Sequence, residues 1–239
     1  MPLLTDRVVL VTGASRGLGA AVAEACAAEG AKLVLVARTR GGLEEVDDRV
    51  RTLGAEATLV RLDLARGELV DALGPAVYER HGRLDGLVAC AGQLGKLSPV
   101  PHLDPKALER LYAVNVLANH RLIRTLDPLL RASDAGRAVF LTDSRASAGP
   151  AFWGGYGAAK AGLEAMARAW AAETARITRL RVNLVDPGPT RTRLREEAFP
   201  GEPAERSQEP AEVAARIVPL LAPAWDRSGE TVSLARDAA

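Results

Sequence analysis

The sequence predicts an α/β fold in which a doubly wound parallel sheet of about seven strands is flanked by helices. Two observations support this prediction. Short, nearly continuous apolar runs rich in Val and Leu recur along the chain, and such runs are typical of strands covered on both faces. Amphipathic stretches of helical length lie between several of these runs, and a repeated strand–helix order makes a parallel sheet. No linker divides the chain, so we expect a single domain over residues 1–239.

The predicted elements follow in chain order. Apolar runs predict strands over residues 7–13, 32–37, 57–63, 84–92, 137–143, 180–186 and 230–235. Helical patterns lie between them over residues 19–31, 41–54 and 104–133, and Pro105 suits a first helical turn behind an Asp cap. The least regular stretch, about 187–210, is predicted to be a mobile flap.

Composition excludes several classes of partner. A net charge of +1, with 31 basic and 30 acidic residues, argues against nucleic acid, for which a basic excess is expected. No apolar run approaches the roughly 20 residues of a membrane helix, and the first residues lack the basic region of a signal peptide. We therefore expect a cytoplasmic protein with no membrane partner. The three histidines have no metal-like spacing, so no metal site is predicted, and Cys26 and Cys90 are expected to be reduced, buried thiols.

A glycine-rich turn between the first strand and the first helix predicts a nucleotide site. Gly13, Gly17 and Gly19 would let the backbone approach a pyrophosphate closely, with Ser15 and Leu18 beside it. The helix that follows presents free N–H groups and the positive end of its dipole to the phosphates. The turn follows a strand and opens a helix, and this context favours a dinucleotide over a plain tight turn.

The end of the second strand indicates which dinucleotide. An acidic residue about 20 residues past the turn would bind the adenosine ribose hydroxyls. This chain has Arg38 there and no carboxylate until Glu44, and Arg16 lies inside the glycine turn. A guanidinium is a good bidentate phosphate ligand, so we predict NADP rather than NAD.

Two further motifs identify a resemblance. "TGASRGLG" (residues 12–19) and "YGAAK" (residues 156–160) resemble the TGxxxGxG and YxxxK motifs of the short-chain dehydrogenase/reductase family. The resemblance covers residues 7 to about 235. It implies a Rossmann-type fold, a nicotinamide cofactor, a small-molecule carbonyl or alcohol substrate, and a homodimer or homotetramer. The small residues Ala158, Gly162, Ala165 and Ala169 would allow close helix contact between subunits, although packing inside one chain explains them equally well.

The resemblance also implies the remaining cofactor contacts. Asp63 and Leu64, at the end of the third strand, would flank the adenine. "CAG" (residues 90–92) matches the family's NAG and brings Ala91 and Gly92 to the cofactor, but Cys90 replaces the usual Asn, whose hydrogen bond must be replaced. The motif "DPGPTRT" would hold the nicotinamide carboxamide through Pro187, Gly188, Thr190 and Thr192.

Tyr156 and Lys160 match the catalytic pair, and their spacing places them on one helix face. A free tyrosine has a pKa of about 10, and one cation about 4 Å away supplies on the order of 4 kcal/mol at an effective dielectric near 20. We therefore expect Lys160 to lower the pKa of Tyr156. Both side chains would also contact the cofactor. Asn115 matches the family's helix asparagine and would hold a water. The predicted activity is hydride transfer between NADP(H) and a carbonyl or secondary alcohol, with Tyr156 as general acid/base.

The family's catalytic serine is not at its usual place. It precedes the tyrosine by about 13 residues, where this chain has Asp143, followed by Ser144. A carboxylate donates no hydrogen bond unless protonated, so chemistry favours Ser144 while spacing favours Asp143. We assign Ser144, with Asp143, Ser147 or a site that works without this donor as alternatives. Asp143 and Cys90 also allow a second interpretation, an NADP-binding sensor or scaffold that turns nothing over.

Overall fold

The computed structural model describes residues 2–236 and contains one parallel sheet of seven strands in the order β3-β2-β1-β4-β5-β6-β7. At its centre, β1 (Val8–Thr12) pairs with β2 (Lys32–Ala37) on one side and with β4 (Gly86–Ala89) on the other. The chain therefore winds outward in both directions from β1, as in a Rossmann-type fold. The predicted fold class is confirmed.

The other strands are β3 (Ala57–Arg61), β5 (Arg137–Leu141), β6 (Arg181–Asp186) and β7 (Thr231–Ser233). Each predicted strand contains one observed strand, but several predictions extend past its carboxyl end. The apolar runs continue there because the residues that leave the sheet are still half-buried, as Cys90 is after β4. These overshooting residues line the site described below.

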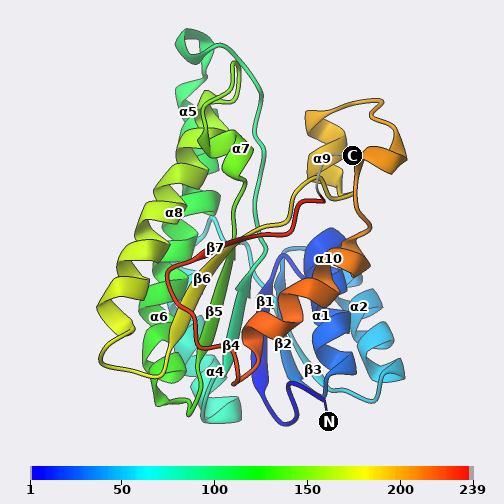
Figure 1. Ribbon diagram of the computed structural model, residues 1–239, viewed down its shortest axis with the longest axis vertical. Coiled ribbons are helices and arrows are strands. Elements are labelled where there is room, and N and C mark those ends of the chain that lie inside the picture. Colours follow the sequence, from blue (N-terminus) through cyan, green and yellow to red (C-terminus); the bar gives the residue numbers. More distant parts are fainter. Residues whose placement is uncertain (1, 237–239) are drawn as a thin grey trace.

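Helices cover both faces of the sheet (Figure 1). On one face, α1 (Gly17–Ala28), α2 (Arg40–Thr52) and α10 (Pro210–Ile217) share a hydrophobic cluster with the strands. The second face carries α4 (Leu73–His81), α6 (Ala118–Ala132) and α8 (Gly154–Thr174), with a second cluster beneath them. Shorter elements are α3 (Gly67–Asp71), α7 (Ser144–Ser147), η1 (Val100–His102) and η4 (Val218–Leu221). No helix among residues 2–236 is long and apolar enough to span a membrane.

The helix predicted over residues 104–133 is continuous but changes pitch. It begins as α5 (Pro105–Tyr112), capped by the Asp104 carboxylate, which accepts the Ala107 N–H at 2.8 Å. A π-helical turn, η2 (Ala113–Leu117), then leads into α6. π-Turns inside α-helices occur frequently at functional sites.

The segment 187–210, predicted to be irregular and mobile, contains regular structure. It holds α9 (Arg193–Ala198) and η3 (Ala204–Arg206), which lie beyond the carboxyl edge of the sheet (Figure 1). The Arg195 guanidinium donates to both carboxylate oxygens of Glu202 at 2.7 and 2.6 Å, which ties the segment to itself. The two helical elements are short, and an ion pair between residues seven apart follows no helix or strand period, so neither left a sign in the sequence. The mobility of the segment stays a prediction.

Candidate active site

A cleft of about 930 Å³ lies at the carboxyl edge of the sheet, where the chain leaves β1 and β4 in opposite directions. Open parallel sheets bind ligands at such a point. Every residue predicted to bind the cofactor lines this cleft. They are Gly13, Ser15, Arg16, Gly17, Leu18, Gly19, Arg38, Asp63, Leu64, Ala91, Gly92, Tyr156, Lys160, Pro187, Gly188, Thr190 and Thr192. Ser144 and Asn115 are not among the lining residues.

The glycine turn has the geometry of a phosphate cradle. A Cβ on Gly13, which has φ +67°, would lie 3.0 Å from the Ala91 backbone, and one on Gly19 would lie 2.4 Å from the Gly13 carbonyl oxygen. Side chains are thus excluded where a pyrophosphate would approach. The first turn of α1 follows Arg16, whose side chain makes no capping hydrogen bond, so its N–H groups are available to an anion.

Thr12 connects the first strand to the turn that contains Cys90. Its hydroxyl oxygen, at the end of β1, accepts the Ala91 N–H at 3.2 Å, which joins the turn after β4 to the central strand. This contact secures the turn in which Cys90 stands where an Asn was expected. Burial raises the pKa of the Cys90 thiol to about 12, so the thiol stays protonated and unreactive.

The far end of the cleft suits a phosphate group. Arg16 and Arg38 both line it and both are exposed, so their guanidinium groups are free to meet a ligand. Glu44, the nearest downstream carboxylate, is paired with Arg40 at 2.8 Å on the surface of α2. The residues present therefore fit a phosphorylated ribose better than a ribose bound through a carboxylate.

Tyr156 and Lys160 lie together on α8 at the other end of the cleft. Each side chain is 5% exposed, and the Lys160 Nζ lies 5.7 Å from the centre of the Tyr156 ring. The ammonium donates a hydrogen bond to the Leu141 carbonyl oxygen at 2.8 Å, which fixes it at the end of β5. Burial lowers the pKa of Lys160 to about 8, although the carboxylate of Asp143 opposes this shift.

The pKa of Tyr156 moves in the direction opposite to the expected one. Burial raises it well above its usual value, and the carboxylates of Asp143 and Asp186 raise it further. The expected lowering by Lys160 alone does not hold, because neither the burial of the phenol nor the positions of the two aspartates can be read from the sequence. The phenol is consequently neutral near pH 7, and its hydroxyl makes no hydrogen bond to any side chain that the structure describes.

Asn115 lies in the π-turn and is fully engaged. Its side-chain oxygen accepts the Gln93 N–H at 2.9 Å and its amide donates to the Gln93 carbonyl at 2.8 Å. Its own carbonyl accepts the amide of Asn119 at 2.9 Å. Asn115 therefore holds the loop after β4 in place beside the cleft, and its predicted contact with a water stays a prediction.

At the serine position, the structure brings Asp143 to the cleft. The Asp143 side chain lines it and caps α7 by accepting the Ala146 N–H at 3.1 Å, whereas Ser144 is exposed and is not part of the lining. Ser147 is turned elsewhere, because its hydroxyl donates to Glu164 at 2.6 Å. The assignment of the donor to Ser144 stays a prediction that the geometry does not favour, since the one-residue step out of β5 points it away from the cleft.

Glu164 is a buried site residue that the sequence analysis missed. Its carboxylate accepts the hydroxyls of Thr142 and Ser147 at 2.6 Å each and pairs with Arg168 at 3.0 Å. It thereby ties the end of β5 and α7 to the catalytic helix. The signal was present, since Glu164 lies one helical turn beyond Lys160 on the same face.

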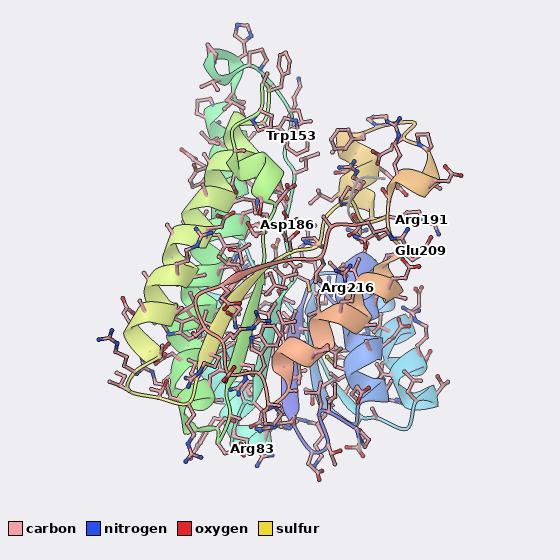
Figure 2. All side chains as sticks on the ribbon, viewed as in Figure 1. Arg83, Trp153, Asp186, Arg191, Glu209 and Arg216 are labelled. Carbon is pink, nitrogen blue, oxygen red and sulfur yellow. The ribbon has the colours of Figure 1, made fainter. Side chains whose placement is uncertain are left out.

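Aromatic rings form the wall opposite the cofactor turn. The Trp153 ring lies 5.9 Å from Tyr156 and 5.6 Å from Phe199, the residue that follows α9. Figure 2 shows Trp153 on one side of the opening and Arg191 of the flap on the other. The flap and Trp153 therefore bound the space next to the Tyr156 hydroxyl.

A glycine cradle at the first turn and a Tyr–Lys pair at the same edge of a parallel sheet define a dinucleotide-dependent oxidoreductase. Residues 7–203 match the family model described as short chain dehydrogenase. The chain is 37% identical over 214 residues to the uncharacterized oxidoreductase YciK of Escherichia coli K12, which covers 88% of this chain and 84% of the relative. The chain belongs to the short-chain dehydrogenase/reductase family.

Solved structures agree with this assignment. A short chain dehydrogenase from Pseudomonas syringae has a TM-score of 0.94 and 34% identity, covering 98% of this chain and 96% of the other. A second one, from Escherichia coli CFT073, was solved with NADPH and has a TM-score of 0.90 and 35% identity over 98% of both chains. The protein is thus an oxidoreductase that uses a nicotinamide cofactor on a small-molecule substrate.

Proposed function

We propose that the protein reduces a small-molecule ketone or aldehyde to the alcohol with NADPH, and that Tyr156 supplies the proton. The observation that carries this proposal is the buried Tyr156–Lys160 pair at one end of the cleft whose other end is the glycine turn. A cofactor bound along the cleft would have its pyrophosphate at the glycine turn and its nicotinamide at the Tyr156–Lys160 pair.

The preference for NADP(H) over NAD(H) is supported by Arg16 and Arg38, which would bind a ribose phosphate bidentately. The NADPH complex of the relative from Escherichia coli CFT073 is consistent with it. Gly13, Gly17 and Gly19 would cradle the pyrophosphate, and Thr190 and Thr192 would meet the nicotinamide end. When bound, the reduced nicotinamide supplies a hydride to the carbonyl carbon.

The protein's own groups handle the proton. Because the Tyr156 phenol is neutral and its hydroxyl is unengaged, it can donate to the oxygen that becomes the alcohol. Lys160 stands beside it as the nearest cation and would also reach the ribose hydroxyls. Asn115 holds the neighbouring loop. Ser144 is exposed, so we infer that Tyr156 polarises the carbonyl without a serine hydroxyl.

The test is Tyr156→Phe, with Tyr78→Phe as the control because Tyr78 is 64% exposed and outside the cleft. We expect the first variant to bind NADPH but to lose its oxidation with ketones, aldehydes and quinones, and the second to behave as wild type. Retained turnover in Tyr156→Phe would remove Tyr156 from the mechanism. NADPH binding by the wild type without turnover of any carbonyl would instead support the sensor or scaffold.

Assembly into a homodimer or homotetramer is also proposed. Ala158, Ala165 and Ala169 are exposed along α8 and Gly162 is half-buried. Packing inside the chain therefore explains little of this stripe of small residues, and close contact with a second subunit is the better account.

A further inference from the structure

The arginines of the flap that line the cleft each have a carboxylate partner. Three of them line the cleft, and each is held by a glutamate of the same region: Arg191 by Glu209, Arg193 by Glu197 at 2.7 Å and Arg195 by Glu202 at 2.6 Å. Figure 2 shows Arg191 and Glu209 next to each other at the base of the flap. These positive charges are therefore already neutralised.

Two carboxylates near Tyr156, unlike the flap arginines, have no ion-pair partner among the described side chains. Asp143 and Asp186 both line the cleft, and neither forms an ion pair with any side chain that the structure describes, a set that leaves out Arg145. Asp186 accepts the backbone N–H groups of Ser144 and Gly188 at 3.2 and 2.9 Å. The Oδ1 of Asp143 accepts the N–H that caps α7, and its Oδ2 has no hydrogen-bond partner among the described side chains, so it could meet a ligand.

Among the side chains that the structure describes, the charge at the reacting end is consequently negative. Lys160 contributes one positive charge there, against the two aspartates, and the reduced nicotinamide ring is neutral. Glu164 is balanced by Arg168. A neutral carbonyl leaves this excess unmatched, whereas a substrate with one positive charge cancels it.

The aromatic wall suits the same kind of ligand. Arg195 already stacks on the Phe199 ring, 3.8 Å from its centre, which leaves the half-buried Trp153 indole beside Tyr156. Cations bind favourably over aromatic faces, and indole is the best of them. A carboxylate and an indole that line the same cleft are complementary to an alkylammonium group.

We propose that the substrate is an amino ketone, a carbonyl compound with a protonated amine one or two carbons from the reacting carbon, and that Asp143 recognises the ammonium. This rests on the proposed function above. A carboxylate cannot donate to a carbonyl oxygen as a serine would, but it accepts readily from an ammonium. In the reaction the carbonyl carbon gains a hydride from NADPH, the oxygen gains the Tyr156 proton, and the amine stays protonated, so the product is an amino alcohol and NADP⁺.

The experiment compares two nearly isosteric ketones, 2-amino-1-phenylethanone and 2-hydroxy-1-phenylethanone, by kcat/KM for NADPH oxidation. We expect the wild type to prefer the amino ketone by roughly tenfold or more, a preference typical of a desolvated ion pair. Asp143→Asn keeps an equally good helix cap and should abolish the preference. Asp143→Ser should reverse it, because the hydroxyl can donate to the carbonyl. Asp104→Asn makes the same change at the exposed cap of α5 and should leave the preference intact.

Each outcome decides between the two proposals. Equal or better turnover of the hydroxy ketone by the wild type would overturn the amino-ketone inference and leave the carbonyl reductase standing. A preference that survives in both Asp143 variants would also overturn it, since the ammonium would then be recognised elsewhere. Turnover of neither ketone, nor of the wider carbonyl panel, would refute the proposed function and the inference with it.

Discussion

Replacing Lys160 by Met should stabilise the protein while destroying its activity. Lys160 is 5% exposed, and burial lowers its pKa from 10.5 to about 8. A pKa that falls on folding means that the folded state binds the proton less tightly than the unfolded chain does. The protonated lysine is therefore a cost to the folded state, and the aliphatic stem of Met fills nearly the same space without a charge.

The size of the gain follows from the two pKa values. A difference of this size corresponds to about 3 kcal/mol at 1.36 kcal/mol per pH unit. Against it stands the hydrogen bond to the Leu141 carbonyl, whose loss costs about 1 kcal/mol. We expect a net increase of about 2 kcal/mol in the free energy of unfolding at pH 7.

The sign of the pH dependence is fixed by the same reasoning. The cost of Lys160 is fully present below its folded pKa of about 8, and it disappears as the pH rises toward the unfolded value of 10.5. The advantage of Lys160→Met should therefore shrink between pH 8 and about pH 10.

The assay is urea unfolding of the cofactor-free protein at one fixed protein concentration, at pH 7 and at about pH 10. Lys106→Met, an exposed change on α5, is the control and should alter stability by no more than about 0.5 kcal/mol at either pH. A Lys160→Met variant that is no more stable than wild type at pH 7, or whose gain is the same at both pH values, would refute the argument.

Two further predictions concern the cofactor and the support of the site. Arg38→Ala should raise the KM for NADPH about tenfold and leave the KM for NADH nearly unchanged. The control is Arg40→Ala, whose partner is Glu44, and it should alter neither KM. Equal effects of Arg38→Ala on both cofactors would rule out a phosphate contact. Glu164→Ala removes the carboxylate that accepts from Thr142, Ser147 and Arg168, so it should lower the free energy of unfolding by about 2–3 kcal/mol in urea titrations. The control is Glu173→Ala, an exposed change on the same helix, which should have a negligible effect.

Periodicity and glycine spacing were sufficient to predict the sheet and the cofactor cleft. The apolar runs are dictated by strands buried on both faces, and the turn at Gly13 and Gly19 admits no side chain, so both leave an unambiguous mark on the sequence. Arg38 could be assigned from its place after the second strand, whereas Thr192 was assigned only through the resemblance of its motif to the family, and both line the cleft.

The features of the site that the sequence did not predict depend on where side chains point in segments outside helices and strands. Whether Asp143 or Ser144 faces the cleft is decided by one residue at the point where β5 ends and α7 begins, and no periodic pattern covers that step. The pKa of Tyr156 needed the burial of the phenol and the position of Asp186, which lies 30 residues along the chain on another strand. The flap ion pairs, such as Arg195–Glu202, likewise depend on a local fold with no sequence period.

The opposite shifts of Tyr156 and Lys160 together set the order of proton transfers. Burial acts against the charged form of each group, so it raises the pKa of the phenol and lowers that of the ammonium. Lys160 is thereby the stronger acid of the pair, which is the reverse of the order in free tyrosine and lysine. In the proposed reaction, the phenolate left when Tyr156 protonates the substrate oxygen would recover its proton from Lys160, and the neutral amine would recharge from solvent near its pKa of about 8. The phenol is therefore protonated near neutral pH, which is the form that a proton donor to a carbonyl oxygen requires.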